Sequence, residues 1–159
     1  MRKNIVIRII PFVTTFLIMA AIFAFSAQNA EQSSQVSRGL TAKIVDILPM
    51  TKNLPSAGKE EAVLNLHNFI RKCAHFSIYF LLGISASAMF LSAREKMSAL
   101  RIWLCCIALC FVYASSDEIH QLFVSGRGAM FSDVLLDTCG GAVGGAVFAA
   151  VRRLLKRKR

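Results

Sequence analysis

Four long apolar stretches constrain the fold of this chain more than any other feature of its sequence. They lie near residues 9–27, 73–93, 102–116 and 134–151, and they approach the roughly 20 apolar residues that an α-helix needs to cross a bilayer. Hydrophobic residues make up 55% of the chain, above the about 45–50% of ordinary soluble domains. The sequence therefore predicts an all-α membrane protein, a four-transmembrane-helix bundle that forms a single domain over residues 1–159.

The basic residues that produce the net charge of +10 are unevenly distributed along the chain. They occur at the N-terminus, in the loop after the second stretch (Arg94, Lys96, Arg101) and in the basic tail 152–159. Lys and Arg in short loops favour the cytoplasm, so we expect a multi-pass protein of the cell membrane with both termini cytoplasmic. Basic residues beside spans are typical of contact with anionic membrane lipid, so we expect no nucleic-acid partner.

The first apolar stretch has two interpretations. A basic start and small residues near Ala24-Phe25-Ser26 are typical of a cleaved signal peptide. Its apolar run is longer than the usual core of a signal peptide, however, and Arg8 and Pro11 interrupt its start. These features favour a retained anchor, and cleavage would leave the orientation of the other three spans unchanged.

The longest segment predicted to be external covers residues 31–70. Apolar residues recur in it at helical spacing in two groups: Val36, Leu40, Ile44 and Ile47/Leu48, then Val63, Leu66 and Phe69/Ile70. Proline and glycine separate the two groups, at Pro49, Pro55 and Gly58. We expect two short external amphipathic helices, which either lie in the membrane interface or pack over the bundle.

Charged and polar residues cluster at the end of each of the last three spans that faces outward in this topology. On each helix they repeat at a spacing of three or four residues and so share one face. Such residues are costly at membrane depth, and three polar stripes at one depth are satisfied only by facing one another. The predicted site contains Arg71, Lys72, His75, Tyr79, Asp117, Glu118, His120, Gln121, Arg127, Asp133 and Asp137.

Other interpretations of these residues are structural. Asp137 or His75 alone would serve as a polar tie between helices, but the number of acids, bases and histidines exceeds what such a tie needs. Gly126-Arg127-Gly128 permits a tight turn that exposes backbone N–H groups beside a cation, a weak signal for an anion-binding nest. The later glycine series, from Gly140 to Gly145, indicates close packing of helices.

At these positions the chain resembles the VanZ-like family of integral membrane proteins. The resemblance rests on Arg71-Lys72-x-x-His75-Phe76-x-x-Tyr79, on Tyr113-Ala114 leading to Asp117-Glu118-x-His120-Gln121, and on Phe123-Val124-Ser125-Gly126-Arg127 with Asp133, Asp137 and Gly140. Ser125 stands where the family usually has proline. The resemblance implies a connection with resistance to the glycopeptide teicoplanin and attaches no reaction to the chain.

Three functions are compatible with an outward-facing polar site. The first is a binding protein that holds an anionic lipid-linked envelope molecule, such as a cell-wall precursor or the lipoglycopeptide itself, through Arg71, Lys72 and Arg127. The second is a membrane-embedded enzyme for phosphoryl transfer or hydrolysis on a lipid-linked precursor, with His75 and His120 as acid or base. The third, a transporter or channel, is disfavoured because the inner halves of the last three spans lack charged residues.

The sequence indicates where the predicted site lies more clearly than it indicates the chemistry of that site. No complete catalytic signature is present, and the spacing of the five cysteines matches no thiolate metal site. Catalytic residues, metal ligands, cofactors and the oligomeric state are therefore left unassigned.

Overall fold

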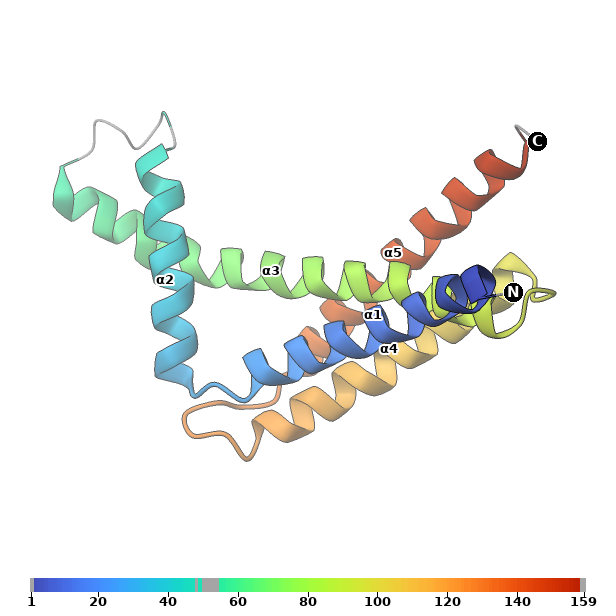
Figure 1. Ribbon diagram of the computed structural model, residues 1–159. Coiled ribbons are helices and arrows are strands. Elements are labelled where there is room, and N and C mark those ends of the chain that lie inside the picture. The colour runs from blue at the N-terminus through green and yellow to red at the C-terminus, as the bar shows by residue number, and fades with distance from the viewer. Residues whose placement is uncertain (1, 48, 50–54, 158–159) are drawn as a thin grey trace.

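A computed structural model describes residues 2–47, 49 and 55–157 of the chain, and it is helical throughout apart from short connections. Leu48 of the first predicted amphipathic group and residues 158–159 of the basic tail lie outside this part. Five helices follow one another (Figure 1): α1 (Arg2–Ser26), α2 (Ala30–Ile47), α3 (Ser56–Ala93), α4 (Ala99–Gln121) and α5 (Phe131–Arg157).

Four of these helices are long and apolar enough to cross a membrane. The qualifying segments are Arg8–Ser26, Ser56–Ala93, Ala99–Gln121 and Phe131–Lys156, which contain the four predicted apolar stretches almost entirely. The prediction of an all-α membrane bundle is thus confirmed. α3, α4 and α5 extend past the apolar stretches that predicted them, so most of the flanking polar residues belong to helices. Arg71 and Lys72 lie within α3, Asp117 to Gln121 end α4 and Asp133 lies in the first turn of α5, whereas Arg127 lies in the loop between α4 and α5.

α5 packs against both α3 and α4, and small residues allow the close approach. A Cβ atom built on Gly140 would lie 2.5 Å from the backbone oxygen of Phe76 in α3. No side chain fits at such a distance, so the two backbones meet directly at this point. The glycines of α5 therefore contribute to helix packing, as their spacing predicted.

α1 joins the bundle through hydrogen bonds as well as apolar contacts. The hydroxyls of Thr15 and Ser85 lie 2.8 Å apart, which connects α1 to α3. The Tyr113 hydroxyl of α4 donates to the backbone oxygen of Met19, at 2.6 Å. α1 thus packs as an integral helix of the bundle, the arrangement expected of a retained anchor.

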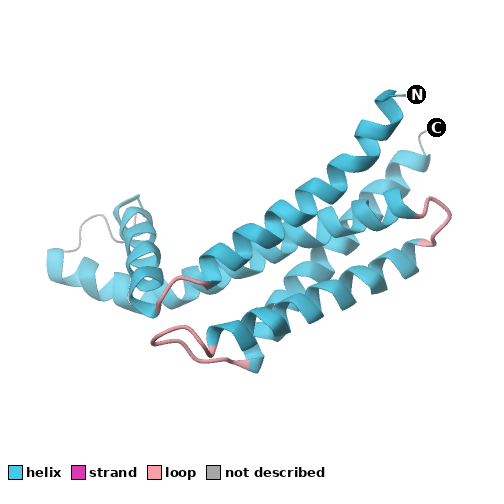
Figure 2. Ribbon diagram, turned by 60° about the horizontal axis from the view of Figure 1, so that its bottom comes forward, coloured by secondary structure: helices cyan, strands magenta, loops and turns pink. Residues whose placement is uncertain are grey.

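The two ends of the bundle carry different connections (Figure 2). The start of α1, the end of α5 and the loop between α3 and α4 lie at one end, where Arg8 and Glu95 form an ion pair. The connections between α1 and α2 and between α4 and α5 lie at the other end. The basic loop and both termini therefore share one side, as the topology argument requires, and the polar clusters gather at the opposite end.

α2 begins with a reciprocal cap and runs across the bundle axis at the end opposite the termini (Figure 1). The backbone N–H of Gln32 donates to Oδ1 of Asn29, and the backbone N–H of Asn29 donates to Oε1 of Gln32. One stripe, formed by Ser37, Thr41 and Val45, is buried. The neighbouring apolar stripe stays exposed, because Val36, Leu40 and Ile47 are 61%, 48% and 79% accessible. α2 therefore packs on the bundle and also offers an apolar face to lipid.

The second predicted amphipathic group does not form a separate short helix. Its residues Val63, Leu66 and Phe69 lie in the first half of α3, which begins at Ser56 rather than near residue 73. No glycine or proline occurs between Lys59 and Leu82, so nothing interrupts the helix before the predicted span. At 1.5 Å per residue α3 exceeds the roughly 30 Å of the hydrocarbon core, and its first turns extend beyond it.

Candidate functional site

A cavity of about 490 Å³ lies between α3, α4, α5 and the loop that joins α4 to α5, at the end opposite the termini. Its volume falls within the roughly 300–1,000 Å³ typical of ligand pockets. Most residues of the predicted site line it, and they are Arg71, Lys72, His75, Glu118, Gln121, Arg127, Asp133 and Asp137. The three polar stripes therefore face one another, as the cost of burying them predicted.

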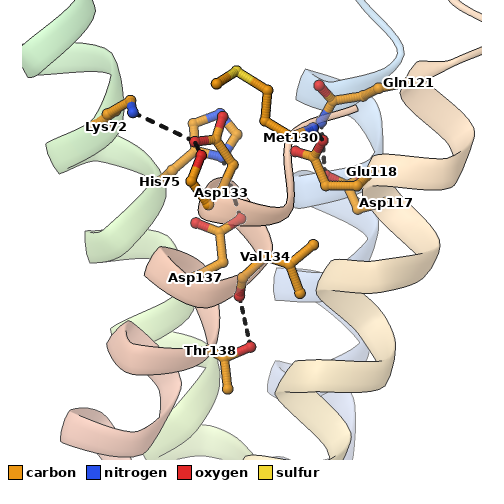
Figure 3. A network of polar contacts seen from close by, with 11 residues as sticks. Lys72, His75, Asp117, Glu118, Gln121, Met130, Asp133, Val134, Asp137 and Thr138 are labelled. Carbon is orange, nitrogen blue, oxygen red and sulfur yellow. Dashed lines mark hydrogen bonds and ion pairs between the residues drawn. The ribbon is translucent and has the colours of Figure 1, made fainter. Parts of the chain in front are cut away.

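An ion pair and a histidine–carboxylate contact connect the α3 wall of the cavity to the α5 wall (Figure 3). Nζ of Lys72 lies 3.5 Å from Oδ1 of Asp133, and Nδ1 of His75 lies 3.6 Å from Oδ2 of Asp137. Asp137 is almost completely buried, whereas the Lys72 side chain is half-exposed. The spacing of four residues between the two aspartates places both on one face of α5, opposite the residues of α3.

The α4 wall is formed by a buried carboxylate that holds the following loop. Glu118 accepts a hydrogen bond from the backbone N–H of Met130, at 2.8 Å, just before α5 begins. Gln121 donates from Nε2 to Oδ2 of the buried Asp117, at 3.2 Å (Figure 3). These bonds fix the end of α4 and the start of α5 around the cavity.

Arg127 enters the cavity from the loop between α4 and α5. The preceding Gly126 has a φ of +73°, a left-handed conformation that glycine adopts without the steric cost of a Cβ. Nε and Nη1 of Arg127 are buried and lack a hydrogen-bond partner among the residues that the structure describes. Burial lowers the pKa of the Arg127 guanidinium, and the nearby charge of Arg71 lowers it further. Arg127 thus lies near a second arginine and has two buried donors without a partner.

Tyr79 and Asp117, both in the predicted site, are buried and do not line the cavity. The Tyr79 hydroxyl, Oδ1 of Asp117 and Oδ1 of Asp137 have no hydrogen-bond partner within the described part of the chain. Tyr79 also forms part of the apolar core of the bundle. These groups extend the polar region from the cavity into the bundle interior.

His120 is the predicted residue that the structure separates most clearly from the cavity. Its ring packs on Phe23 of α1, with 4.8 Å between the ring centroids. His120 follows Glu118 by two residues, and residues two apart on a helix do not share a face. The same side of α4 carries Tyr113, whose hydroxyl also reaches α1. His120 is therefore placed for packing between α1 and α4.

Six residues of the cavity wall were not in the predicted site. Gly126 and Gly128 flank Arg127 in the predicted turn, whereas sequence reasoning missed Ala30, Asn68, Met130 and Leu136. Asn68 precedes Arg71 by three residues, so helical spacing contained a signal for it. Met130 contributes its backbone N–H to Glu118, and a backbone donor leaves no signal in the sequence. Ala30 belongs to α2, and only the folded chain brings α2 to the loop after α4.

The arrangement provides cations for an anionic group and carboxylates that position those cations. The described residues contain no group of three His, Cys, Asp or Glu side chains arranged to hold a metal ion. The Lys72 and His75 side chains each have a carboxylate partner, whereas Arg71 and Arg127 make no ion pair among the residues described. The two arginines are therefore the groups best placed to receive a ligand.

Comparison with known proteins identifies the family of the chain. No curated protein and no solved structure matches it. The model of the VanZ/LLP1 family matches residues 12–153, which include most of the bundle and every residue of the cavity wall. The chain therefore belongs to the VanZ/LLP1 family of membrane proteins.

Proposed function

We propose that this protein binds, in the cavity, the anionic group of a lipid-linked envelope molecule at the outer face of the cell membrane. The observation that carries the proposal is the guanidinium of Arg127. Two of its nitrogens are buried without a partner in the described residues, and the guanidinium lies near the charge of Arg71. Buried donors of this kind are costly unless a partner receives their hydrogen bonds.

A bound anion would accept the hydrogen bonds that the Arg127 nitrogens lack, and its negative charge would offset the repulsion between the two arginines. Guanidinium groups donate pairs of hydrogen bonds to phosphate or carboxylate oxygens in a fixed planar geometry. The carboxylates of Asp133 and Asp137 already lie against Lys72 and His75, at 3.5 and 3.6 Å. They are therefore less available to Arg71 and Arg127, which supports a ligand as the partner of the arginines.

The position of the cavity supports a lipid-linked ligand. The cavity lies beside the middle of α3 and between the end of α4 and the start of α5. This is the end of the bundle opposite the termini (Figure 2), where the headgroups of the surrounding lipid are expected. The basic loop and the basic end of α5 lie at the opposite end of the bundle, and the positive-inside rule assigns that end to the cytoplasm. The cavity consequently faces outward, toward molecules of the cell envelope.

The resemblance to VanZ-like proteins suggests which envelope molecules to consider. Teicoplanin resistance connects the family to glycopeptides that bind the cell-wall precursor. The ligand is therefore expected to be a lipid-linked wall precursor, or the acylated glycopeptide itself. Both carry a hydrocarbon chain that holds them at the outer membrane surface.

The pairing of His75 with Asp137 favours a second candidate, a membrane-embedded enzyme that transfers or hydrolyses a phosphoryl group of the same ligand. A carboxylate beside one ring nitrogen orients an imidazole. The other nitrogen is then the candidate acid or base. Both functions would use the two arginines to hold the anion. They differ in whether the bound molecule is chemically altered.

Native mass spectrometry of the full-length protein released from membranes tests the proposal. We expect an anionic lipid-linked molecule to remain bound, and Arg127→Gln to remove most of it. Arg101→Gln is the matched control, because Arg101 is exposed at the opposite end of the bundle. Equal retention by Arg127→Gln and the native chain would contradict the binding proposal. Release of inorganic phosphate from the recovered lipid, abolished by His75→Ala, would favour the enzyme.

A further inference from the structure

We propose that the apolar groove between α1, α2 and α3 holds the hydrocarbon chain of the same ligand whose anionic group lies in the cavity. This inference rests on the proposed function and adds to it the part of the protein that recognises the chain. The groove has a volume of about 200 Å³. Its apolar walls are contributed chiefly by Ile22 and Phe25, Val36 and Leu40, and Ile70 and Ile78, two from each helix.

The groove and the cavity meet at the cations. Arg71, His75 and Arg127 line both of them. The apolar side chains of the groove are therefore followed by the two guanidinium groups and then by the polar walls of the cavity. An amphiphile has the same order of chemistry, from hydrocarbon chain to anion to polar headgroup. This correspondence of charge and polarity is the main support for a single ligand that occupies both.

The way in which α2 is held makes the groove part of the site. The backbone N–H of Ala30, at the start of α2, donates to the carbonyl of Ser125, at 3.3 Å. A Cβ built on Gly126 would lie 3.1 Å from the Cβ of Ala30, so the loop and α2 are in close contact. The loop that places Arg127 in the cavity thus also positions the α2 wall of the groove.

The exposed stripe of α2 indicates what occupies the groove. Val36 and Leu40 are large apolar residues that remain more than 45% accessible, although the buried stripe of α2 packs the helix on the bundle. All three walls are helices, whose backbone groups are bonded within each helix, so they offer no edge for an extended peptide. A flexible hydrocarbon chain fits such walls without any need for hydrogen bonds.

The groove orients the ligand more than it adds affinity. A chain that leaves the bilayer for the groove exchanges one apolar environment for another, so the hydrophobic gain is small. Its effect is to hold the anion beside Arg71 and Arg127 in one orientation, which reduces the freedom lost on binding. A soluble anion has no hydrocarbon chain through which the groove could orient it. The site should therefore prefer anions that are attached to a chain.

Photocrosslinking of lipid probes to the full-length protein in phosphatidylcholine vesicles tests the proposal. The first probe is an alkyl phosphate with a diazirine on its chain near the phosphate, and the second carries the same chain on a phosphocholine headgroup. We expect adducts of the first probe on α2 around Val36 and Leu40 and on α3 around Ile78. The second probe should label these positions roughly tenfold less, because phosphocholine is zwitterionic and the two arginines face an anion.

Two substitutions should block the groove while Arg71 and Arg127 are kept. Ala74→Phe and Val36→Trp each add bulk to a residue of the groove wall that does not line the cavity. Either should reduce labelling of the groove by the phosphate probe roughly tenfold. Cys73→Phe is the control, since Cys73 is exposed beside Ala74 and lines neither space. If Ala74→Phe fails to elute as a monodisperse protein, Val36→Trp provides the same test.

The outcomes separate this inference from the proposed function. The groove is supported as the binding site of the hydrocarbon chain if Ala74→Phe or Val36→Trp loses groove labelling while native mass spectrometry still shows retained anionic lipid. Labelling spread evenly over lipid-facing residues such as Phe16 and Leu17 overturns the groove while anion binding stands. Groove labelling by the phosphate probe that is unchanged in Arg127→Gln overturns the inference, because chain and anion would then bind independently.

Discussion

His75 of α3 and Asp137 of α5 face each other across the contact between their helices, with 3.6 Å between Nδ1 and Oδ2. Asp137 is 2% accessible, and its other carboxylate oxygen has no partner among the described residues. A charge at such a position is stabilised chiefly by the group opposite to it. The pair therefore joins the packing of the bundle to the chemistry of the cavity, and each of its members can be tested separately.

Removal of His75 should destabilise the bundle more than removal of both members of the pair. His75→Ala leaves a buried carboxylate unpaired, at a cost of roughly 1–3 kcal/mol in the free energy of unfolding. In the double variant His75→Ala/Asp137→Asn the charge is absent, so the combined loss should be smaller than the sum by about 0.5–3 kcal/mol. Denaturant unfolding in mixed micelles measures these differences.

His67→Ala is the control for that cycle, because His67 also lies on α3 and its ring hydrogen-bonds with the backbone oxygen of Leu64, away from the site. It should change the free energy of unfolding little. Strictly additive effects of the two site substitutions would show that His75 and Asp137 do not stabilise each other.

The two glycines at residues 39 and 140 should respond in opposite ways to the same substitution. A Cβ at Gly140 would lie 2.5 Å from the backbone oxygen of Phe76, so Gly140→Ala must separate α3 from α5, at roughly 1–3 kcal/mol. A Cβ at Gly39 meets nothing within 4 Å, so Gly39→Ala should stabilise α2 by roughly 0.5–1 kcal/mol. Thermal unfolding in detergent compares the two, and equal tolerance of both would contradict the close packing described here.

The topology predicts opposite labelling of two loops in intact cells. In a variant whose five native cysteines are replaced by alanine, Lys96→Cys tests the loop between α3 and α4, and Ala129→Cys tests the loop between α4 and α5. An impermeant maleimide added outside should label residue 129 alone, because basic loops are retained in the cytoplasm. Permeabilised cells provide the control for reactivity. External labelling of residue 96 would reverse the orientation and place the cavity inside.

Drug susceptibility should depend on Arg127 if the ligand is the one proposed. Expression of the native chain is expected to lower susceptibility to teicoplanin more than to vancomycin, because teicoplanin carries an acyl chain that holds it at the membrane surface. Arg127→Gln should abolish the difference, whereas Arg101→Gln should preserve it, with equal protein levels measured in the same cells. Resistance that persists in Arg127→Gln would separate the cavity from the drug.

The spans and the polar end of the bundle could be predicted because both depend on local sequence. An apolar run of sufficient length crosses a membrane wherever it occurs, and residues three or four apart share a helix face. These rules placed Arg71 and His75 of α3, and Asp133 and Asp137 of α5, on facing stripes. Neither rule applies to the loop cation Arg127, for which the Gly126-Arg127-Gly128 turn was only a weak signal.

The rotation of each helix, and the path of the chain outside the spans, were decided by tertiary structure alone. His120 turns toward Phe23 rather than the cavity, because packing of α4 against α1 sets which of its polar side chains faces inward. α2 docks through its buried stripe while its apolar stripe remains exposed. The sequence by itself thus determined which residues must avoid lipid. The contacts between helices decided which of those residues meet, because a single helix contains no information about its neighbours.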